Sequence, residues 1–183
     1  MRNTITMFKS SSKELKSVKC LTACSMLMAL SIILGYMSFY LTESIRISFT
    51  YVPIAIIGIL YGPIVGACTA GAVDLLNFVI KPGGSFAPGI TLCAILTGFI
   101  YGFFLYRKNF TLIRLSLTVL CNTFFVDFLL KSYVLACLYG TSFIGYLGIR
   151  LPVQLIMLVL NTLIIYLLVN ALKKSNVFSL IRE

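Results

Sequence analysis

Residues 50–80 read TYVPIAIIGILYGPIVGACTAGAVDLLNFVI, and Asp74 is the only charged residue among them. The Gly62-Pro63 pair divides this stretch, and because proline is favoured at the first position of a helix, we predict two helices, 50–61 and 63–80. The first would cover only roughly 18 Å at about 1.5 Å per residue, against a bilayer hydrocarbon core of about 30 Å. Non-helical backbone at membrane depth needs protein around it. We therefore expect the preceding segment, TESIRISFT at 42–50, to enter the protein and line a site.

The composition is that of a membrane protein. The chain has 183 residues, of which 60% are hydrophobic and 11% are charged, whereas soluble domains carry about 25% charged residues. The mean hydropathy is +1.03. We predict an all-α integral membrane protein with a single membrane domain, 1–183, made of a basic N-terminal segment (1–18), a helical bundle (19–172) and a tail (173–183). The six predicted transmembrane helices are 20–40, 50–61, 63–80, 88–106, 112–138 and 148–172.

The basic residues indicate the orientation of the chain. The net charge of +10 comes from 15 Lys and Arg against 5 Asp and Glu, and most of the basic residues lie near segment ends on one side of the predicted bundle. By the positive-inside rule both termini are cytoplasmic, and 41–49, 81–88 and 139–147 are outer loops. This placement makes the charge a topology signal rather than a nucleic-acid site. Six cysteines without a CxxC pair, and no histidine, predict neither a metal site nor a disulfide framework.

Polar residues inside the predicted helices are the candidate site. Asp74 and Asn77 are three residues apart and share a face, and Asp127 and Lys131 can pair at i, i+4. Local capping of Asp74, a purely intrahelical Asp127–Lys131 pair, or snorkelling of Arg150 would each be a structural explanation. Together, carboxylates, amides and cations suit a ligand with a donor-rich part and an anionic part. The candidate binding residues are Asp74, Asn77, Asp127, Lys131, Arg150, Gln154 and Arg46, with Asn122 as a secondary contact and Asn161 near the stripe of Arg150 and Gln154.

Three further patterns concern loops and packing. KPGGSFAPG at 81–89 holds more proline and glycine than a connector between helices needs, which favours a loop over a ligand site. Ser25 and Ala29 form a small-xxx-small pattern that lets another helix approach closely. The repeated Gly58–Gly62 and Gly98–Gly102 spacing indicates close helix packing. The chain has no P-loop and no catalytic Ser/His/Asp set, so we expect no ATP hydrolysis and no enzyme activity.

Motifs along most of the chain resemble the substrate-binding S components of energy-coupling-factor (ECF) vitamin transporters, above all the folate-specific branch. The resemblance covers about residues 18–172, and Val159 departs from it by replacing an expected proline. The motifs are IRISFTYVPI (45–54), GPIVGA (62–67) followed by Asp74, PGGSFAPGIT (82–91), LTGFIYG (96–102), and the polar positions Arg150, Gln154 and Asn161.

The resemblance implies capture of a vitamin, most specifically folate, by a subunit of a bacterial cell membrane importer. The partners would be a transmembrane coupling protein, contacted through Ser25 and Ala29, and two ATPase subunits, with no cofactor in this chain itself. Asp74 or Asp127 would accept hydrogen bonds from the pterin. Lys131, Arg150, Arg46 and Lys81 are candidates for the glutamate carboxylates, and the gating residues would be Ser48, Phe49, Lys81, Phe86 and Pro88. Another vitamin, or a self-sufficient small carrier, remains the alternative, and a membrane enzyme ranks last.

Overall fold

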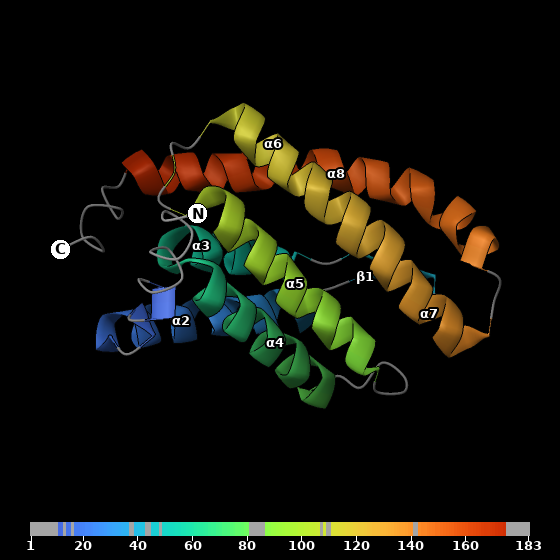
Figure 1. Cartoon of the computed structure of the whole chain (residues 1–183), viewed down its shortest axis with the longest axis horizontal. Coiled ribbons are helices and arrows are strands. Elements are labelled where there is room, and N and C mark those ends of the chain that lie inside the picture. The colour runs from blue at the N-terminus through green and yellow to red at the C-terminus, as the bar shows by residue number, and fades with distance from the viewer. Residues whose placement is uncertain are drawn as a thin grey trace.

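The protein is a bundle of long helices (Figure 1), and its described residues also form one small β-hairpin. The computed structural model describes residues 11–12, 14–15, 17–36, 39–42, 45–47, 49–80, 87–106, 108, 111–140 and 143–174. Within these ranges the chain forms α2 (Val18–Tyr36), β1 (Phe39–Thr42), β2 (Ile45–Ile47), α3 (Tyr51–Tyr61), α4 (Pro63–Ile80), α5 (Pro88–Leu105), α6 (Leu112–Cys121), the π-helix η1 (Asn122–Leu130), α7 (Lys131–Tyr139) and α8 (Phe143–Lys174).

Within the described parts of the chain, five helical segments are long and apolar enough to cross a membrane. They are Val18–Tyr36, Pro63–Ile80, Pro88–Leu105, Leu112–Leu138 and Leu151–Ala171. The fourth consists of α6, η1 and α7, which follow one another without a break. The sixth predicted helix, α3, has 11 residues, and at about 1.5 Å per residue it covers roughly 17 Å. The structure therefore confirms the short helix and the break at Gly62-Pro63, and among the residues it describes there are five helices of spanning length rather than six.

The predicted all-α architecture is confirmed for the helices, but the structure adds two short strands, at 39–42 and 45–47, that the sequence analysis does not predict. The segment expected to end the first helix instead forms β1, which pairs antiparallel with β2 through Phe39–Ile47, Tyr40–Arg46 and Thr42–Ile45. Aromatic and β-branched residues favour strands, and the Ile-Arg-Ile alternation has the period of a strand. This short strand signal is hard to find in the sequence because it stands between two much stronger helical ones.

The predicted outer loop 139–147 is also wrong over most of its length. Gly140 has a left-handed backbone (φ +64°) and ends α7, but α8 begins at Phe143, five residues before the predicted start at 148. Gly145 and Gly148 lie within this helix rather than in a loop. A helix satisfies its own backbone hydrogen bonds, so this segment can remain helical despite its glycines.

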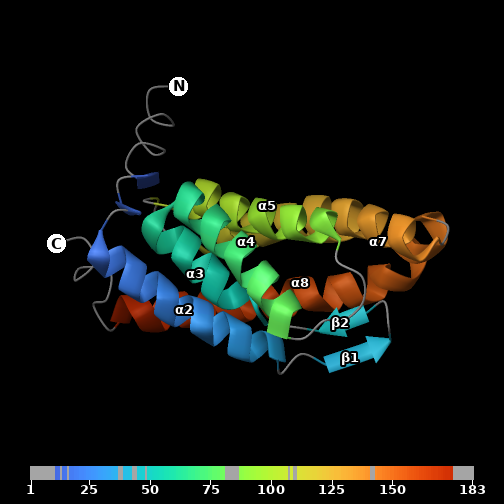
Figure 2. The same ribbon diagram turned by 90° about the horizontal axis from the view of Figure 1, so that it is seen from below.

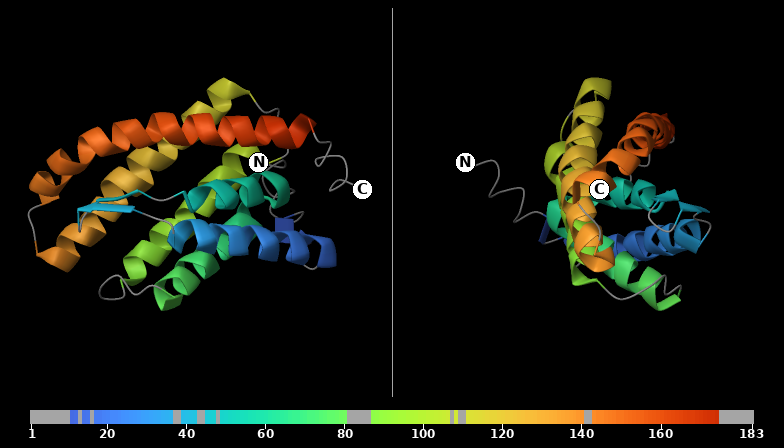
Figure 3. Two further views of the ribbon diagram at one scale, coloured as in Figure 1. Left: turned by 180° about the vertical axis from the view of Figure 1, so that it is seen from behind. Right: turned by 90° about the vertical axis from the view of Figure 1, so that its right-hand side faces the viewer.

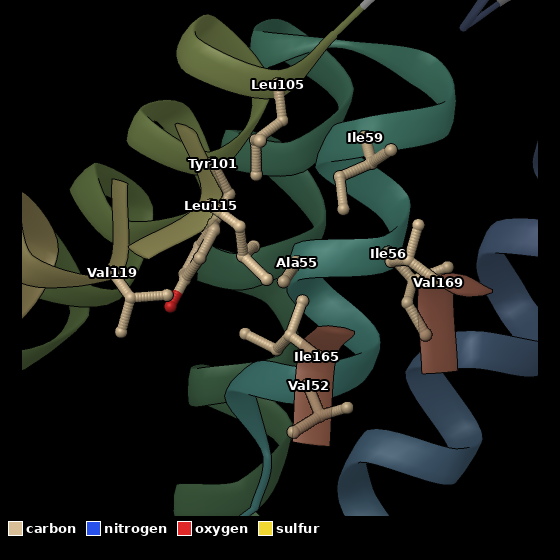
Figure 4. Close-up of a cluster of buried hydrophobic side chains, with 10 residues drawn as sticks. All are labelled: Val52, Ala55, Ile56, Ile59, Tyr101, Leu105, Leu115, Val119, Ile165 and Val169. Atoms are coloured by element: carbon tan, nitrogen blue, oxygen red, sulfur yellow. The ribbon is translucent and has the colours of Figure 1, made fainter. Parts of the chain in front are cut away.

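The short helix α3 forms the centre of the bundle. Its residues from Val52 to Ile59 are all buried, as expected for a helix that is apolar on every side. Figure 4 shows the main apolar cluster, in which α3 meets side chains from α5, α6 and α8. The cluster consists of Val52, Ala55, Ile56, Ile59, Tyr101, Leu105, Leu115, Val119, Ile165 and Val169.

Glycines bring α3, α4 and α5 into backbone contact. A Cβ atom added to Gly98 would lie 2.1 Å from the carbonyl oxygen of Gly66, and one added to Gly58 would lie 2.9 Å from the backbone nitrogen of Gly102. A Cβ on Gly102 would lie 2.5 Å from Cα of Pro63. The glycine repeat therefore serves helix packing, which confirms the interpretation from the sequence.

The α3–α4 turn is fixed by residues that precede the bundle. Gly62 has φ +95°, a conformation that favours glycine. The Ser11 hydroxyl is buried against this turn and donates a hydrogen bond to the Tyr61 carbonyl (2.9 Å). The Tyr106 hydroxyl at the end of α5 donates to Glu14 Oε1 at 2.8 Å. These contacts hold the first described residues against the bundle.

The two ends of the bundle differ in structure. The start of α2, the α3–α4 turn and the end of α8 lie together at one end, and the hairpin lies toward the other (Figures 2 and 3). Along α5, α6–η1–α7 and α8, the apolar cluster occupies the part nearer the α3–α4 turn. The parts nearer the hairpin carry the polar residues described next.

Candidate ligand-binding site

A polar cavity lies between the helices in the half of the bundle nearer the hairpin. It contains about 610 Å³ of empty space, part of which is open to solvent. Six segments of the chain contribute to its wall, which consists of Thr50, Tyr51, Ile54, Ala70, Val73, Asp74, Asn77, Ala94, Thr97, Asn122, Asp127, Lys131 and Asn161.

The π-helix η1 and the start of α7 supply a pair of oppositely charged side chains. Lys131 Nζ lies 3.5 Å from Asp127 Oδ1, which confirms the predicted i, i+4 pair. The Asn122 side chain donates from Nδ2 to Asp127 Oδ2 at 3.3 Å. Asn122 and Asp127 are five residues apart, a spacing that a π-helix aligns and an α-helix does not. The wider turn thus places the amide, the carboxylate and the ammonium group on one face.

The second carboxylate, Asp74, comes from α4. Asp74 and Asn77 both line the cavity, as their three-residue spacing predicts. Asn77 lies tightly against α2, because a Cβ atom added to Gly35 would come 2.4 Å from Asn77 Oδ1. Among the described residues, Asp74 has neither an ion pair nor a hydrogen bond.

Hydrogen bonds connect the cavity wall across helices that are distant in sequence. The Tyr51 hydroxyl, at the start of α3, donates to Oδ1 of Asn161 in α8. The Ser31 hydroxyl of α2 donates to the Thr50 carbonyl at 2.7 Å. Together these bonds fix the first turn of α3 between α2 and α8.

We predict that Tyr51→Phe destabilises the protein by about 1–3 kcal/mol, because it leaves the carbonyl of the buried Asn161 side chain unpaired. At roughly 2–4 °C per kcal/mol for a chain of this size, the thermal midpoint in detergent should fall by several degrees. Tyr133→Phe is the matched control, since Tyr133 is 60% exposed and should tolerate the loss of its hydroxyl. Equal midpoints for the two variants would show that the Tyr51–Asn161 bond contributes little.

The structure brings together four of the seven predicted binding residues: Asp74, Asn77, Asp127 and Lys131. Gln154 is half-buried on α8 and is not part of the cavity wall. Arg46 and Arg150 belong to β2 and α8, but their side chains lie outside the described residues.

The predicted gating residues are only partly described. Phe49 is half-buried and packs against the apolar cluster. Pro88 is exposed and occupies the start of α5, where its fixed φ suits the first helical turn. Ser48, Lys81 and Phe86 lie outside the described residues.

Several wall residues were absent from the predicted set or ranked low in it. Thr50, Tyr51 and Thr97 were not proposed as contacts, although they lie in the motifs 45–54 and 96–102. Asn122 is predicted only as a secondary contact, and Asn161 is not among the predicted binding residues. A search for polar residues within the conspicuous motifs would have found the first three. The pairing of Tyr51 with Asn161 joins residues 110 positions apart, so no local spacing indicates it.

A bundle of apolar helices around a polar cavity defines a multi-pass membrane protein that binds a small polar molecule. The particular family follows from the sequence: residues 19–169 match the family model of the ECF transporter, substrate-specific component. Because this match covers most of the chain, the protein belongs to that family, whose members are transporter components.

Individual relatives agree with the family assignment. The chain is 29% identical to a folate transporter FolT of Clostridium novyi (strain NT) over 152 residues, which is 83% of this chain and 88% of the relative. It is 28% identical to a folate transporter FolT of Leuconostoc mesenteroides, covering 80% and 82%. A crystal structure of FolT bound with folic acid matches with a TM-score of 0.79 and 28% identity, covering 85% of this chain and 95% of that one.

Proposed function

We propose that the protein captures folate at the outer face of a bacterial cell membrane as the substrate-binding subunit of an ECF-type importer. The observation that carries this proposal is the match over 95% of the length of a FolT structure that holds folic acid. The cavity supports it independently, because its polar wall suits a small molecule with many hydrogen-bonding groups.

The chemistry of the wall fits the two ends of folate. The pterin carries an amino group beside ring nitrogens, and carboxylate and amide oxygens such as those of Asp74, Asp127 and Asn122 accept hydrogen bonds from such groups. The glutamate end carries two carboxylates, for which Lys131, Arg46, Arg150 and Lys81 are candidate partners. We place the pterin deepest and the glutamate toward the hairpin end.

The remaining parts of the proposal concern topology and partners. Both termini are cytoplasmic, α3 is counted as the sixth membrane helix, and the segments 41–49 and 81–88 close over the ligand from outside. The subunit docks on a transmembrane coupling protein and two ATPase subunits. Exposed Ser25 and Ala29 on α2 supply a surface for such docking, because small residues allow close helix contact.

Binding of folic acid to the purified chain in detergent tests this function directly. We expect isothermal titration to give a dissociation constant below the micromolar range, whereas thiamine and riboflavin should show no comparable binding. Tight binding of another vitamin with weak binding of folic acid would contradict the folate assignment. Reconstituted alone in liposomes, the chain should bind but not accumulate labelled folic acid, and accumulation without an ATPase would instead support a self-sufficient carrier.

A further inference from the structure

The two carboxylates of the cavity have different surroundings. Both oxygens of Asp127 are already in use: Oδ1 lies 3.5 Å from Lys131 Nζ, and Oδ2 accepts a hydrogen bond from Asn122 Nδ2 at 3.3 Å. The Asp127 side chain is 27% exposed and that of Lys131 36% exposed, so the pair forms at the cavity wall. All three residues belong to η1 and the first turn of α7, so their geometry is fixed within one helical rod.

Asp74 lies in the same cavity without such a partner among the described residues. The described wall contains two carboxylates, Asp74 and Asp127, and one ammonium group, Lys131. Since Lys131 neutralises Asp127, the charge of Asp74 is left uncompensated within this set. An unpaired charge inside a membrane segment is costly, and such residues are commonly functional. A ligand with strong hydrogen-bond donors would compensate it.

A second acceptor without a donor lies beside the Asp127–Lys131 ion pair. Asn122 is 3% exposed, and its Oδ1 has no hydrogen-bond partner among the described residues although it belongs to the cavity wall. The bond from Nδ2 to Asp127 fixes the orientation of the amide, so that Oδ1 is the atom left without a donor. Burying an acceptor without a donor is unfavourable, and a ligand N–H group would remove this cost.

From these contacts we infer that Asp74 is the carboxylate that binds the donor edge of the ligand, while Asp127 is a positioning residue that holds Lys131 and Asn122. The inference rests on the proposed function and specifies it. Asp74 accepts two parallel N–H bonds from an amidine-like edge, in which an amino group stands beside a ring N–H. Asn122 Oδ1 accepts a further N–H bond from the same head group.

Two isosteric variants, Asp74→Asn and Asp127→Asn, separate these roles. For Asp74→Asn we expect folic acid affinity to fall at least about tenfold, because hydrogen bonds to charged groups are the stronger kind. Its ligand-free melting temperature should equal or exceed that of the wild type, because an uncompensated charge is removed. For Asp127→Asn we expect a lower ligand-free melting temperature, because Lys131 loses its partner, and a smaller fall in affinity than for Asp74→Asn.

Competition of pterin and lumazine against labelled folic acid identifies the residue that contacts the amino group. Lumazine has an oxo group where pterin has the amino group, so it lacks one donor of the amidine-like edge. The wild type and Asp127→Asn should prefer pterin, and Asp74→Asn should lose that preference. Loss of the preference in Asp127→Asn alone would overturn the inference.

The stability of the two variants without ligand distinguishes the roles of Asp74 and Asp127 even if folic acid is not the ligand. Failure of the wild type to bind folic acid would refute the proposed function, whereas the ligand-free melting temperatures still test which carboxylate supports the fold. Failure of Asp127→Asn to fold supports its structural role. Failure of Asp74→Asn to fold, or a clear drop in its melting temperature, contradicts the inference.

Discussion

Gly98→Leu should abolish the folded protein, and Gly98→Ala should lower its stability strongly. A Cβ atom at this position would lie 2.1 Å from the carbonyl oxygen and 2.6 Å from the carbonyl carbon of Gly66, and 2.9 Å from Cβ of Ala70. The closest of these atoms belong to the backbone of α4, so no side-chain rotation can make room. Overpacking of a well-packed interior costs about 1–3 kcal/mol and sometimes more. This exceeds the gain of about 0.5–1 kcal/mol that alanine gives over glycine within a helix.

Thermal unfolding in detergent, followed by circular dichroism or by size-exclusion chromatography after heating, measures this effect. Gly148→Ala is the matched control, because Gly148 lies within α8 and a Cβ atom there would meet nothing within 4 Å. It should leave the melting temperature unchanged or raise it slightly through helix propensity. If Gly98→Ala melts like Gly148→Ala, α4 and α5 can separate without cost, and the glycines are not required for packing.

The same glycines show what the sequence could predict and why. Local spacing was sufficient for the glycine repeat, for Asp127 with Lys131, and for Asp74 with Asn77, since each depends on the geometry of one helix. It was also sufficient for the short helix α3, whose end is marked by Gly62-Pro63. In each case the residues that decide the structure are neighbours in the chain.

Features that depend on tertiary structure were missed. The Tyr51–Asn161 bond requires α3 and α8 to meet, and no pattern near either residue indicates that contact. The importance of Asn122 depends on the π-helix, because in a regular α-helix a residue five positions from Asp127 would face elsewhere. The strands β1 and β2 were missed because their short signal stands between two much stronger helical ones, and the early start of α8 at Phe143 was missed because Gly145 and Gly148 suggest a loop.

Replacing Ala29 with phenylalanine should stop folate uptake by cells while leaving folate binding intact. This expectation rests on the proposed docking of α2 to the coupling protein. Ser25 and Ala29 are both exposed on α2, beside exposed Leu21 and Met26. The Ser25 hydroxyl is satisfied within its own helix by the Leu21 carbonyl at 2.8 Å, so it adds no polar cost to an apolar interface. A bulky ring at Ala29 would hold a partner helix away from this surface, and Ser25→Phe, one turn earlier, should act in the same way.

Two measurements on each variant are needed to assign the effect to docking. Uptake of labelled folic acid into cells that also carry the coupling protein and the ATPases should fall to background for Ala29→Phe, whereas isothermal titration of the purified variant should give the wild-type dissociation constant. Ala171→Phe is the control of equal size, because Ala171 is likewise exposed but lies on α8 near the end of the bundle. It should retain both uptake and binding. Wild-type uptake by Ala29→Phe would place the docking surface elsewhere, and loss of binding would show that the ring disturbs the subunit itself rather than its contact with a partner.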